Sequence, residues 1–473
     1  MSSLHVSPET IPGSTRKPGV YFEFNLRLAV RTLTTNLQRT LIIAQKTAAG
    51  TWPANSPVSV YSSDEAGILF GAGSQAHLMV KAALLANRYL YLDVIAVDDA
   101  LAGVAAVKTV TLTGPATGTG VYTLSIANQS VQVAVSSGDT ASAIADTVAA
   151  QAQFQLDLPM TVSAAAGVLT LTAKNKGGQG QGIQVAASST ASGVTSALAS
   201  TATGQTEPSL TNALATVFGA GHDIIVSAWN DADTLTAIRT HLESVNSAIE
   251  QRSCIGVTAV ATTLSQATTL ATALNSGFIS PALAPNVPAM ACEVAAAYGA
   301  VIAFEEDPAR PLNTLTLTGM PISPLPNRLG RMEIETALHN GVTPLVVGPG
   351  NKLQIERAIT SYTQNQAGIP DPALLDLTTI RTLNFVRKAV RERLALRFPR
   401  DKKTTRTKAK VRSEIIDVLL KLEELEIVEN VLEYLAFIVI EDDLQDANRL
   451  NIRIPVDVVN GLHVFAGIID LIL

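Results

Sequence analysis

The chain has 473 residues, a net charge of −6 and only 16% charged residues. That balance excludes a protein that binds nucleic acid over its whole surface, because phosphate binding needs a basic face. The length allows two or three domains with large cores. Two cysteines, Cys254 and Cys292, are too few for a disulfide framework. We therefore expect two buried thiols in a protein made in the cytoplasm.

The first predicted element is a long strand behind a loose N-terminal arm. Residues 1–17 are rich in proline, serine and threonine and have no apolar signal segment, which predicts a flexible arm. Pro18-Gly19 then opens an alternating apolar run from Val20 to Val30. A strand at residues 18–30 beside a flexible terminus is typical of a segment that pairs with another chain.

Helices and strands alternate through most of the chain, with one interruption. This order predicts an α/β fold, a mixed sheet core covered by helices, in residues 18–104 and 206–350. The expected strands cover residues 37–46, 91–99, 223–229, 254–261, 278–283 and 343–348, and the expected helices cover 74–90, 231–249, 264–275, 289–307 and 331–341.

The interruption at residues 105–205 has a different composition. Short alternating runs separated by turn residues predict an inserted β-rich domain with one helix at 140–152 and loops at 177–182 and 188–193. The alternative is a disordered low-complexity linker, but the period-2 apolar pattern favours the domain. Its six charged residues are Lys108, Asp139, Asp146, Asp157, Lys174 and Lys176.

Residues 351–473 form the predicted C-terminal domain, which begins with a basic amphipathic helix at 376–400. Thr378 or Thr379 can cap its start, and Pro399 lies just past its end. An acidic helix at 414–432 follows, with Ser413 as its expected cap. Strands at 433–442, 449–457 and 461–473 close the chain. An apolar terminal strand needs a pairing partner.

A basic stretch at residues 401–412 separates the two helices. It has no interleaved aromatic residue, which argues against a stacking surface for nucleic acid. Three interpretations remain: a solvated loop, a docking surface for an acidic protein, or a nucleic-acid contact. Its six basic side chains are Lys402, Lys403, Arg406, Lys408, Lys410 and Arg412.

The sequence contains no complete motif for catalysis or cofactor binding. The glycine-containing loops complete neither a dinucleotide fingerprint nor a P-loop, and no zinc-protease or nucleophile-elbow motif occurs. The acidic runs at 305–307 and 441–443 could hold a cation, but a solvated turn is the simpler interpretation. We expect no enzyme, cofactor, bound metal or membrane insertion. The six histidines are scattered: His5, His77, His222, His241, His339 and His463.

The order of these parts resembles contractile-tail sheath proteins, in particular those of Mu-like phages, and more distantly the sheaths of R-type pyocins and type VI secretion. The insertion fits the outward-facing extra domain that is common in that family. The resemblance rests on an ordered set of segments: 17–21, 356–362, 376–383, 386–387, 398–400, Lys402, 448–451 and 461–464.

The resemblance implies a structural protein of the virion tail, assembled in the host cytoplasm. Its subunits would form hexameric rings stacked helically around a tail tube, with baseplate and tail terminator proteins at the ends and no direct contact with nucleic acid. A metastable lattice would convert to a shorter, wider one through two packings that differ by only a few kcal/mol per subunit.

Site residues follow from the same resemblance. The basic stretch 402–412, or the neighbouring helix, would face the tube. The two terminal arms would pair with neighbouring subunits, and their expected contact residues are Val20, Tyr21, Phe22, Phe24, Leu26, Leu28, Leu462, Val464, Ile468, Ile469 and Leu471.

Two other functions remain open at this stage. One is a non-contractile tail or adhesion protein in which the β-rich insertion binds sugar. The other is an α/β enzyme that uses residues 219–350.

Overall fold

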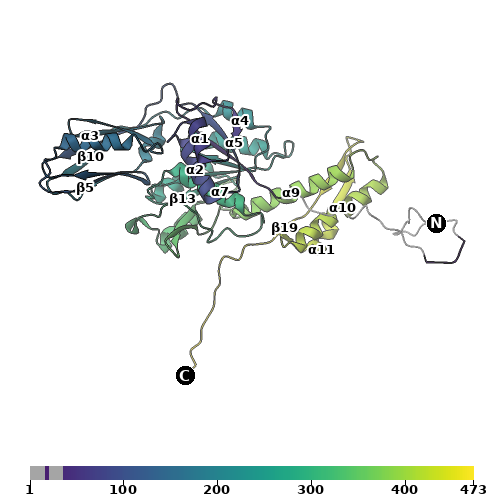
Figure 1. Ribbon diagram of the computed structural model, residues 1–473. Coiled ribbons are helices and arrows are strands. Elements are labelled where there is room, and N and C mark those ends of the chain that lie inside the picture. Colours follow the sequence, from purple (N-terminus) through teal and green to yellow (C-terminus); the bar gives the residue numbers. More distant parts are fainter. Residues whose placement is uncertain (1–15, 21–35, 473) are drawn as a thin grey trace.

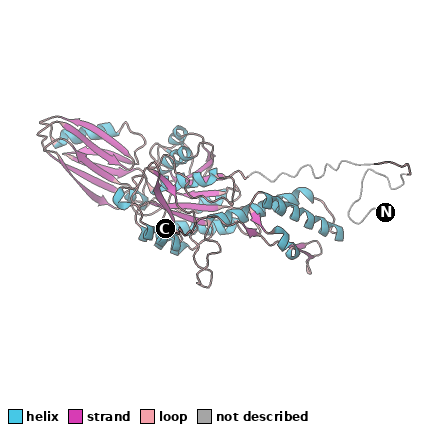
Figure 2. Cartoon of the chain, turned by 90° about the horizontal axis from the view of Figure 1, so that it is seen from below, coloured by secondary structure: helices cyan, strands magenta, loops and turns pink. Residues whose placement is uncertain are grey.

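The computed structural model describes residues 16–20 and 36–472. They form three parts in a row: a β-rich lobe, a central body and a helical C-terminal lobe (Figure 1). The view from below keeps the same order, with the two lobes at opposite ends of the body (Figure 2). The molecule is therefore elongated, and its central body lies between the two lobes.

The central body is built on one eight-stranded sheet. Its order is β15-β14-β13-β12-β11-β1-β3-β2. The inner strands run parallel, whereas β2 and β15 pair antiparallel at the two edges. The predicted mixed sheet is confirmed. The strands are β1 Arg39–Gln45, β2 Pro57–Ser59, β3 Tyr91–Val97, β11 Ile224–Ser227, β12 Ile255–Val260, β13 Ile279–Leu283, β14 Thr343–Gly348 and β15 Lys352–Ile355.

Helices cover both faces of this sheet, so its inner strands are largely buried and mostly apolar. Helices α2 and α7 pack together on one face, and α5 and α6 pack together on the other. Ser74 caps α2 by accepting the N–H of His77, and Asp231 caps α5 in the same way. The helices of the body are α1 Ser63–Phe70, α2 Gln75–Ala86, α4 Thr211–Val217, α5 Ala232–Val245, α6 Leu264–Leu274, α7 Ala291–Phe304 and α8 Arg331–His339, with a 3₁₀ turn at Leu325–Asn327.

The β-rich lobe contains two antiparallel sheets, β10-β4-β8-β7 and β6-β5-β9, with helix α3 packed on them. The linker alternative is wrong, because alternate strand positions are buried here. Strands β9 and β10 were not expected, since their small residues alternate weakly, and β9 includes part of the predicted loop 188–193. The elements are β4 Val107–Thr113, β5 Gly120–Ile126, β6 Gln129–Val135, α3 Ala141–Ala152, β7 Met160–Ala165, β8 Val168–Ala173, the 3₁₀ turn Gly178–Gly182, β9 Val185–Ser189 and β10 Thr195–Ala202.

Buried polar contacts join this lobe to the body. The Asn175 side chain accepts the N–H of Gln75 at 3.0 Å and donates to the carbonyl of Lys46 at 2.9 Å. Glu207 accepts the N–H of Gly178 at 2.7 Å. Burial raises the pKa of this carboxyl. The apolar core also continues from the body into the lobe.

The C-terminal lobe is a helical hairpin with two small sheets. Helices α9 and α10 enclose a second apolar core that includes Phe385, Ile415 and Leu422. Buried Arg393 lies between Glu414 at 3.2 Å and Asp417 at 3.1 Å, which ties the two helices together. The elements are α9 Leu377–Arg397, α10 Thr405–Glu424, β16 Val428–Glu429, α11 Val431–Tyr434, a 3₁₀ turn at Leu435–Phe437, β17 Val439–Asp442, β18 Leu450–Arg453 and β19 Asp457–Val458.

Several predicted boundaries in this lobe are wrong. The basic stretch is not a separate loop, because α10 begins inside it: Thr404 accepts the N–H of Thr407 as the cap, and Ser413 lies within the helix. The same helix stops at Glu424, well before residue 432. Only the last part of 433–442 is a strand, because a helical turn comes first.

The predicted caps of α9 are also wrong. The helix begins after Asp376, whose carboxylate makes no capping bond and instead holds Arg357 in a two-pronged ion pair at 2.9 and 2.8 Å.

Candidate assembly interface

The C-terminal arm, residues 461–472, contains no strand or helix. Its apolar side chains lie in solvent, from Leu462 at 66% to Ile469 at 99% exposed, and Figure 1 shows the segment running away from the body. Val464, Ile468 and Leu471 are exposed in the same way. A row of free backbone groups and bare apolar side chains is a template for pairing with another chain.

The N-terminal arm is described only in part. Val20 is 83% exposed. The other expected pairing residues, Tyr21, Phe22, Phe24, Leu26 and Leu28, lie outside the described residues. The arm pairing predicted for this segment therefore stays a prediction.

The two small sheets of the C-terminal lobe have few strands. β16 and β19 pair over two residues each, Val428 opposite Val458 and Glu429 opposite Asp457. β17 and β18 pair over four. Two-stranded sheets are marginal alone and gain from an added strand. Both sheets leave edges without a partner strand within residues 36–472.

Three of the six basic side chains in the stretch 401–412 serve the lobe itself. Lys403 lies 3.0 Å from a carboxylate oxygen of Asp442, and Lys408 pairs with the other oxygen. The hydrogen bond from Lys408, followed by that from Lys403, lowers the pKa of Asp442. Arg412 donates to the carbonyl of Leu435 at 2.7 Å. The two lysines tie the start of α10 to β17, so the run 441–443 is the paired end of a strand and not a solvated turn.

The other three basic side chains, Lys402, Arg406 and Lys410, are exposed. They follow one another at intervals of four residues, which places Arg406 and Lys410 on one face of α10. None of the three side chains makes an ion pair or hydrogen bond with the described part of the chain. They form a basic row, which we call the 402–410 row.

The charges on α10 oppose the helix dipole. Arg406 and Lys408 lie in its first turn, and its last turn holds Glu423 and Glu424 beside Lys421, although a helix favours acids at its start and bases at its end. Each misplaced charge costs on the order of 0.3–1 kcal/mol. Of the 402–410 row, Arg406 lies in that first turn, so the helix dipole does not account for a cation there.

Two basic side chains of α9 bind backbone carbonyls of the central body. Arg387 donates to the carbonyl of Asn246 at 2.7 Å, and Arg391 donates to that of Gln251 at 2.6 Å. Both bonds fasten α9 to the central body. The sequence showed these cations on one face of a helix but gave no sign that backbone carbonyls receive them.

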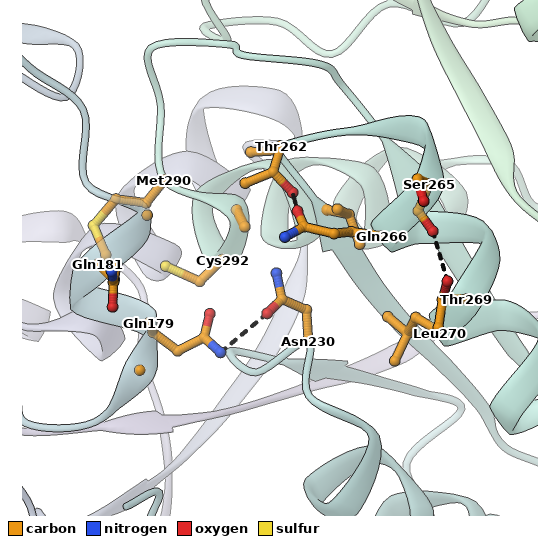
Figure 3. A pocket seen from close by; sticks show the side chains of 15 residues that line it. Gln179, Gln181, Asn230, Thr262, Ser265, Gln266, Thr269, Leu270, Met290 and Cys292 are labelled. Carbon is orange, nitrogen blue, oxygen red and sulfur yellow. Dashed lines mark hydrogen bonds between the residues drawn. The ribbon is translucent and has the colours of Figure 1, made fainter. Parts of the chain in front are cut away.

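A cavity of about 580 Å³ lies at the carboxyl ends of β11 and β12, where open α/β sheets commonly bind ligands. Figure 3 shows Gln179 from the β-rich lobe bonded to Asn230, and Thr262 bonded to Gln266. The lining side chains are uncharged. Burial raises the pKa of the Cys292 thiol, which disfavours a reactive thiolate. The lining offers no acid–base pair.

Cys254 and Cys292 are both free and buried, as predicted. Within residues 16–20 and 36–472, no helix is long and apolar enough to span a membrane. The same residues bring no three acidic, histidine or cysteine side chains together in a metal-binding group.

Comparison with known proteins decides the family. Residues 203–361 match the family described as phage tail sheath protein central domain, and residues 370–472 match the phage tail sheath C-terminal domain. The Mu-like prophage FluMu tail sheath protein of Haemophilus influenzae is 30% identical over 99% of this chain and 100% of its own length. The chain belongs to the phage tail sheath proteins. The resemblance inferred from the sequence is confirmed.

Membership makes the chain a contractile tail sheath subunit, located in the tail sheath of a phage or prophage. The family is structural rather than enzymatic, so the adhesion and enzyme alternatives are wrong. The pocket in Figure 3 therefore belongs to a structural subunit.

Solved structures share the fold. The sheath tail protein of Listeria innocua superimposes with a TM-score of 0.50 at 15% identity, over 91% of this chain and 94% of its own. A chain in the six-fold symmetrised baseplate of the anti-feeding prophage reaches 0.52 at 11% identity, over 97% and 100%. A chain of that particle's helical sheath in the contracted state reaches 0.50 at 11% identity, over 97% and 99%. In that contractile system the sheath assembles helically.

Proposed function

We propose that the chain polymerises as hexameric rings stacked helically around a tail tube, and that contraction of this sheath drives the tube through a bacterial envelope. Baseplate and tail terminator proteins would close its two ends. The observation that carries the proposal is the C-terminal arm, because seven apolar side chains are bare within this one short segment: Leu462, Val464, Phe465, Ile468, Ile469, Leu471 and Ile472.

The arms would work by strand addition. Residues 18–30 of one subunit and 461–472 of another would extend the short sheets β16–β19 and β17–β18, which supplies ladder partners and covers the apolar side chains. A link of this kind bends without breaking, so rigid subunits can change their packing while staying connected.

Polymer shape tests the proposal. We expect the purified full-length protein to form hollow tubes in negative-stain images. Removal of residues 464–473 should leave a protein with the same melting temperature that forms no tubes. The matched control replaces exposed Ile68 with Ser, which also removes a bare apolar side chain but lies on the body. Tubes of normal length from the truncated chain would contradict the arm mechanism.

We also propose that the 402–410 row helps to hold the extended sheath on an acidic tube surface. Six basic side chains were predicted to do this, but Lys403, Lys408 and Arg412 already have partners within the lobe. The supporting observations are the exposure of the row and the place of Arg406 in the first turn of α10, where a cation opposes the helix dipole. Exposed pairs contribute roughly 0.2–1 kcal/mol each, so the hold would be collective and would weaken with salt.

A charge reversal separates tube binding from folding. We expect the triple variant Lys402→Glu, Arg406→Glu, Lys410→Glu, co-expressed with tube protein, to assemble mainly as contracted, tube-free sheath. The matched control reverses three exposed cations on the body, Arg88, Arg331 and Lys352, and should give extended tails. Extended tails of normal length from the first variant would show that the row does not face the tube.

A further inference from the structure

The N-terminal arm enters the body beside one particular loop, residues 305–313, which follows α7. Asn36 is the residue at which the described chain resumes, and its side chain donates to the carbonyl of Glu306 at 2.6 Å. Gln38 donates to the Asn36 oxygen at 2.7 Å and so orients that amide. The root of the N-terminal arm is thus tied to the backbone of this loop.

The C-terminal arm leaves from the same loop. His463 is largely buried, with 14% of its side chain exposed, although Leu462 and Val464 on either side of it are bare. Its Nδ1 lies 2.9 Å from the side-chain nitrogen of Asn313. Burial lowers the pKa of His463, and the neutral ring accepts this hydrogen bond.

Gly461 brings the backbone of the arm close to the loop. A Cβ at this position would lie 2.9 Å from the ring of Pro311 and 2.7 Å from the His463 ring, which is too close for any other residue without movement. His463 also lies 3.7 Å from Asp376, the carboxylate that Arg357 holds at the start of α9. The root at 461–463 is therefore docked, whereas the residues beyond it are exposed.

The loop that receives both roots is itself fixed between the body and the C-terminal lobe. Buried Arg381 of α9 donates to the carbonyl of Glu305 at 2.5 Å. Pro308 and Ala309 are buried, and Ala309 belongs to the apolar core of the C-terminal lobe. A displacement of this loop would therefore move or strain its contacts with the body, with α9 and with the roots of both arms.

We propose that residues 305–313 form a shared anchor for the two terminal arms, with Asn36 and His463 as the positioning residues that dock them. The inference rests on the proposed pairing of the arms with neighbouring subunits. Tension on one arm then reaches the root of the other through this single loop, and each arm bends only beyond its docked root. The free part of the C-terminal arm, residues 464–472, can reach about 30 Å when extended, at roughly 3.3 Å per residue.

Hydrogen–deuterium exchange on the purified full-length protein tests the anchor directly. The variants are Asn36→Ala and His463→Ala, and the control is Val464→Ala, which changes a bare side chain just outside the root. We expect either variant to raise exchange several-fold in peptides that cover 305–313 and also at the root of the other arm. His463→Gln, which keeps an acceptor for Asn313, should restore most of the protection. The control should match the wild type.

Changes confined to the mutated arm's own root would overturn the shared anchor. Faster exchange in Val464→Ala equal to that in His463→Ala would overturn the role of His463. Tube formation is measured on the same samples and reports separately on arm pairing. If the exchange results are as expected but every variant forms normal tubes, the anchor stands and the proposed function of the arms is what fails.

Discussion

The central body and the C-terminal lobe differ in how many of their strands have a hydrogen-bonded neighbour on both sides. In the body, β1 and β11–β13 each have a hydrogen-bonded neighbour on both sides, and every residue of β12 is buried. In the C-terminal lobe the sheets have two strands, and the arm beyond them pairs with no strand of the described chain. The strands of the body are paired within the chain, whereas in the proposed assembly neighbouring subunits would complete the sheets of the lobe and pair with the arms. That division is what a polymer needs if its units stay rigid while their packing changes.

Among the proposed changes, removal of the N-terminal arm should have the largest effect on polymerisation. We expect deletion of residues 1–30 to leave a folded, soluble protein that no longer polymerises, because the body keeps all its strands and neighbouring subunits lose an added one. Sedimentation should show less than about a tenth of the wild-type polymer. Tubes at normal length from this truncation would mean that the arm does not link subunits.

Loss of the buried cation between α9 and α10 should affect the C-terminal lobe alone. Arg393→Met leaves Glu414 and Asp417 facing an apolar side chain, and breaking such a buried group costs roughly 3 kcal/mol. Hydrogen exchange in α9 and α10 should rise, while the fluorescence of Trp52 and Trp229, both in the body, should report unchanged unfolding. A shift of the tryptophan transition by the same amount would show that the two regions unfold together.

A substitution of Glu293 should instead change the stability of the central body alone. Burial raises its pKa from 4.5 to about 7. Between pH 4.5 and 7 this carboxyl is ionised in the unfolded chain but still protonated in the folded chain. The free energy of unfolding should therefore fall as pH rises through this range. Glu293→Gln keeps an acceptor for the N–H of Met290 and removes the titration. It should raise stability at pH 8 by roughly 3 kcal/mol, since each unit of pKa shift corresponds to about 1.4 kcal/mol.

Urea titrations followed by tryptophan fluorescence at pH 5 and pH 8 check this expectation. Tube formation by Glu293→Gln should be normal, because the residue lies far from both arms in the sequence and is buried in α7. An unchanged pH slope in the variant would contradict the role of Glu293.

The smallest effect on assembly is expected from the β-rich lobe. Val104 and Gln205 lie side by side, joined by two backbone hydrogen bonds of 3.0 and 3.1 Å, so a short Gly/Ser linker can replace residues 105–205. We expect this variant to assemble and contract, since the lobe lies at the far end from the C-terminal lobe. Because the lobe shares an apolar core with the body, its removal exposes apolar side chains, so solubility must be measured as well. Failure of the variant to form tubes would show that the lobe takes part in contacts between subunits.

The sequence predicted the body well, because its signals are local. Runs such as 254–261 and 278–283 are mostly apolar, and helices α2, α5 and α6 begin at Ser, Asp and Thr caps. It predicted the C-terminal lobe less well. Helix α10 starts eight residues before the expected cap Ser413, because lysine and arginine are good helix formers and Thr404 offers an earlier cap.

Long-range pairings could not be predicted. No spacing in the sequence links Asp442 to Lys403 and Lys408, or His463 to Asn313, 150 residues away. The six basic residues therefore formed one set in the sequence, and only the fold divides them into paired and free side chains.

A high-resolution reconstruction of the polymer formed by the full-length chain tests the central claim most directly. The account predicts a hollow helical tube in which residues 18–30 and 461–472 are strands added to the C-terminal sheets of neighbouring subunits. The central body should be unchanged from the isolated subunit. A polymer held together only by contacts between bodies, with both arms unpaired, would contradict it.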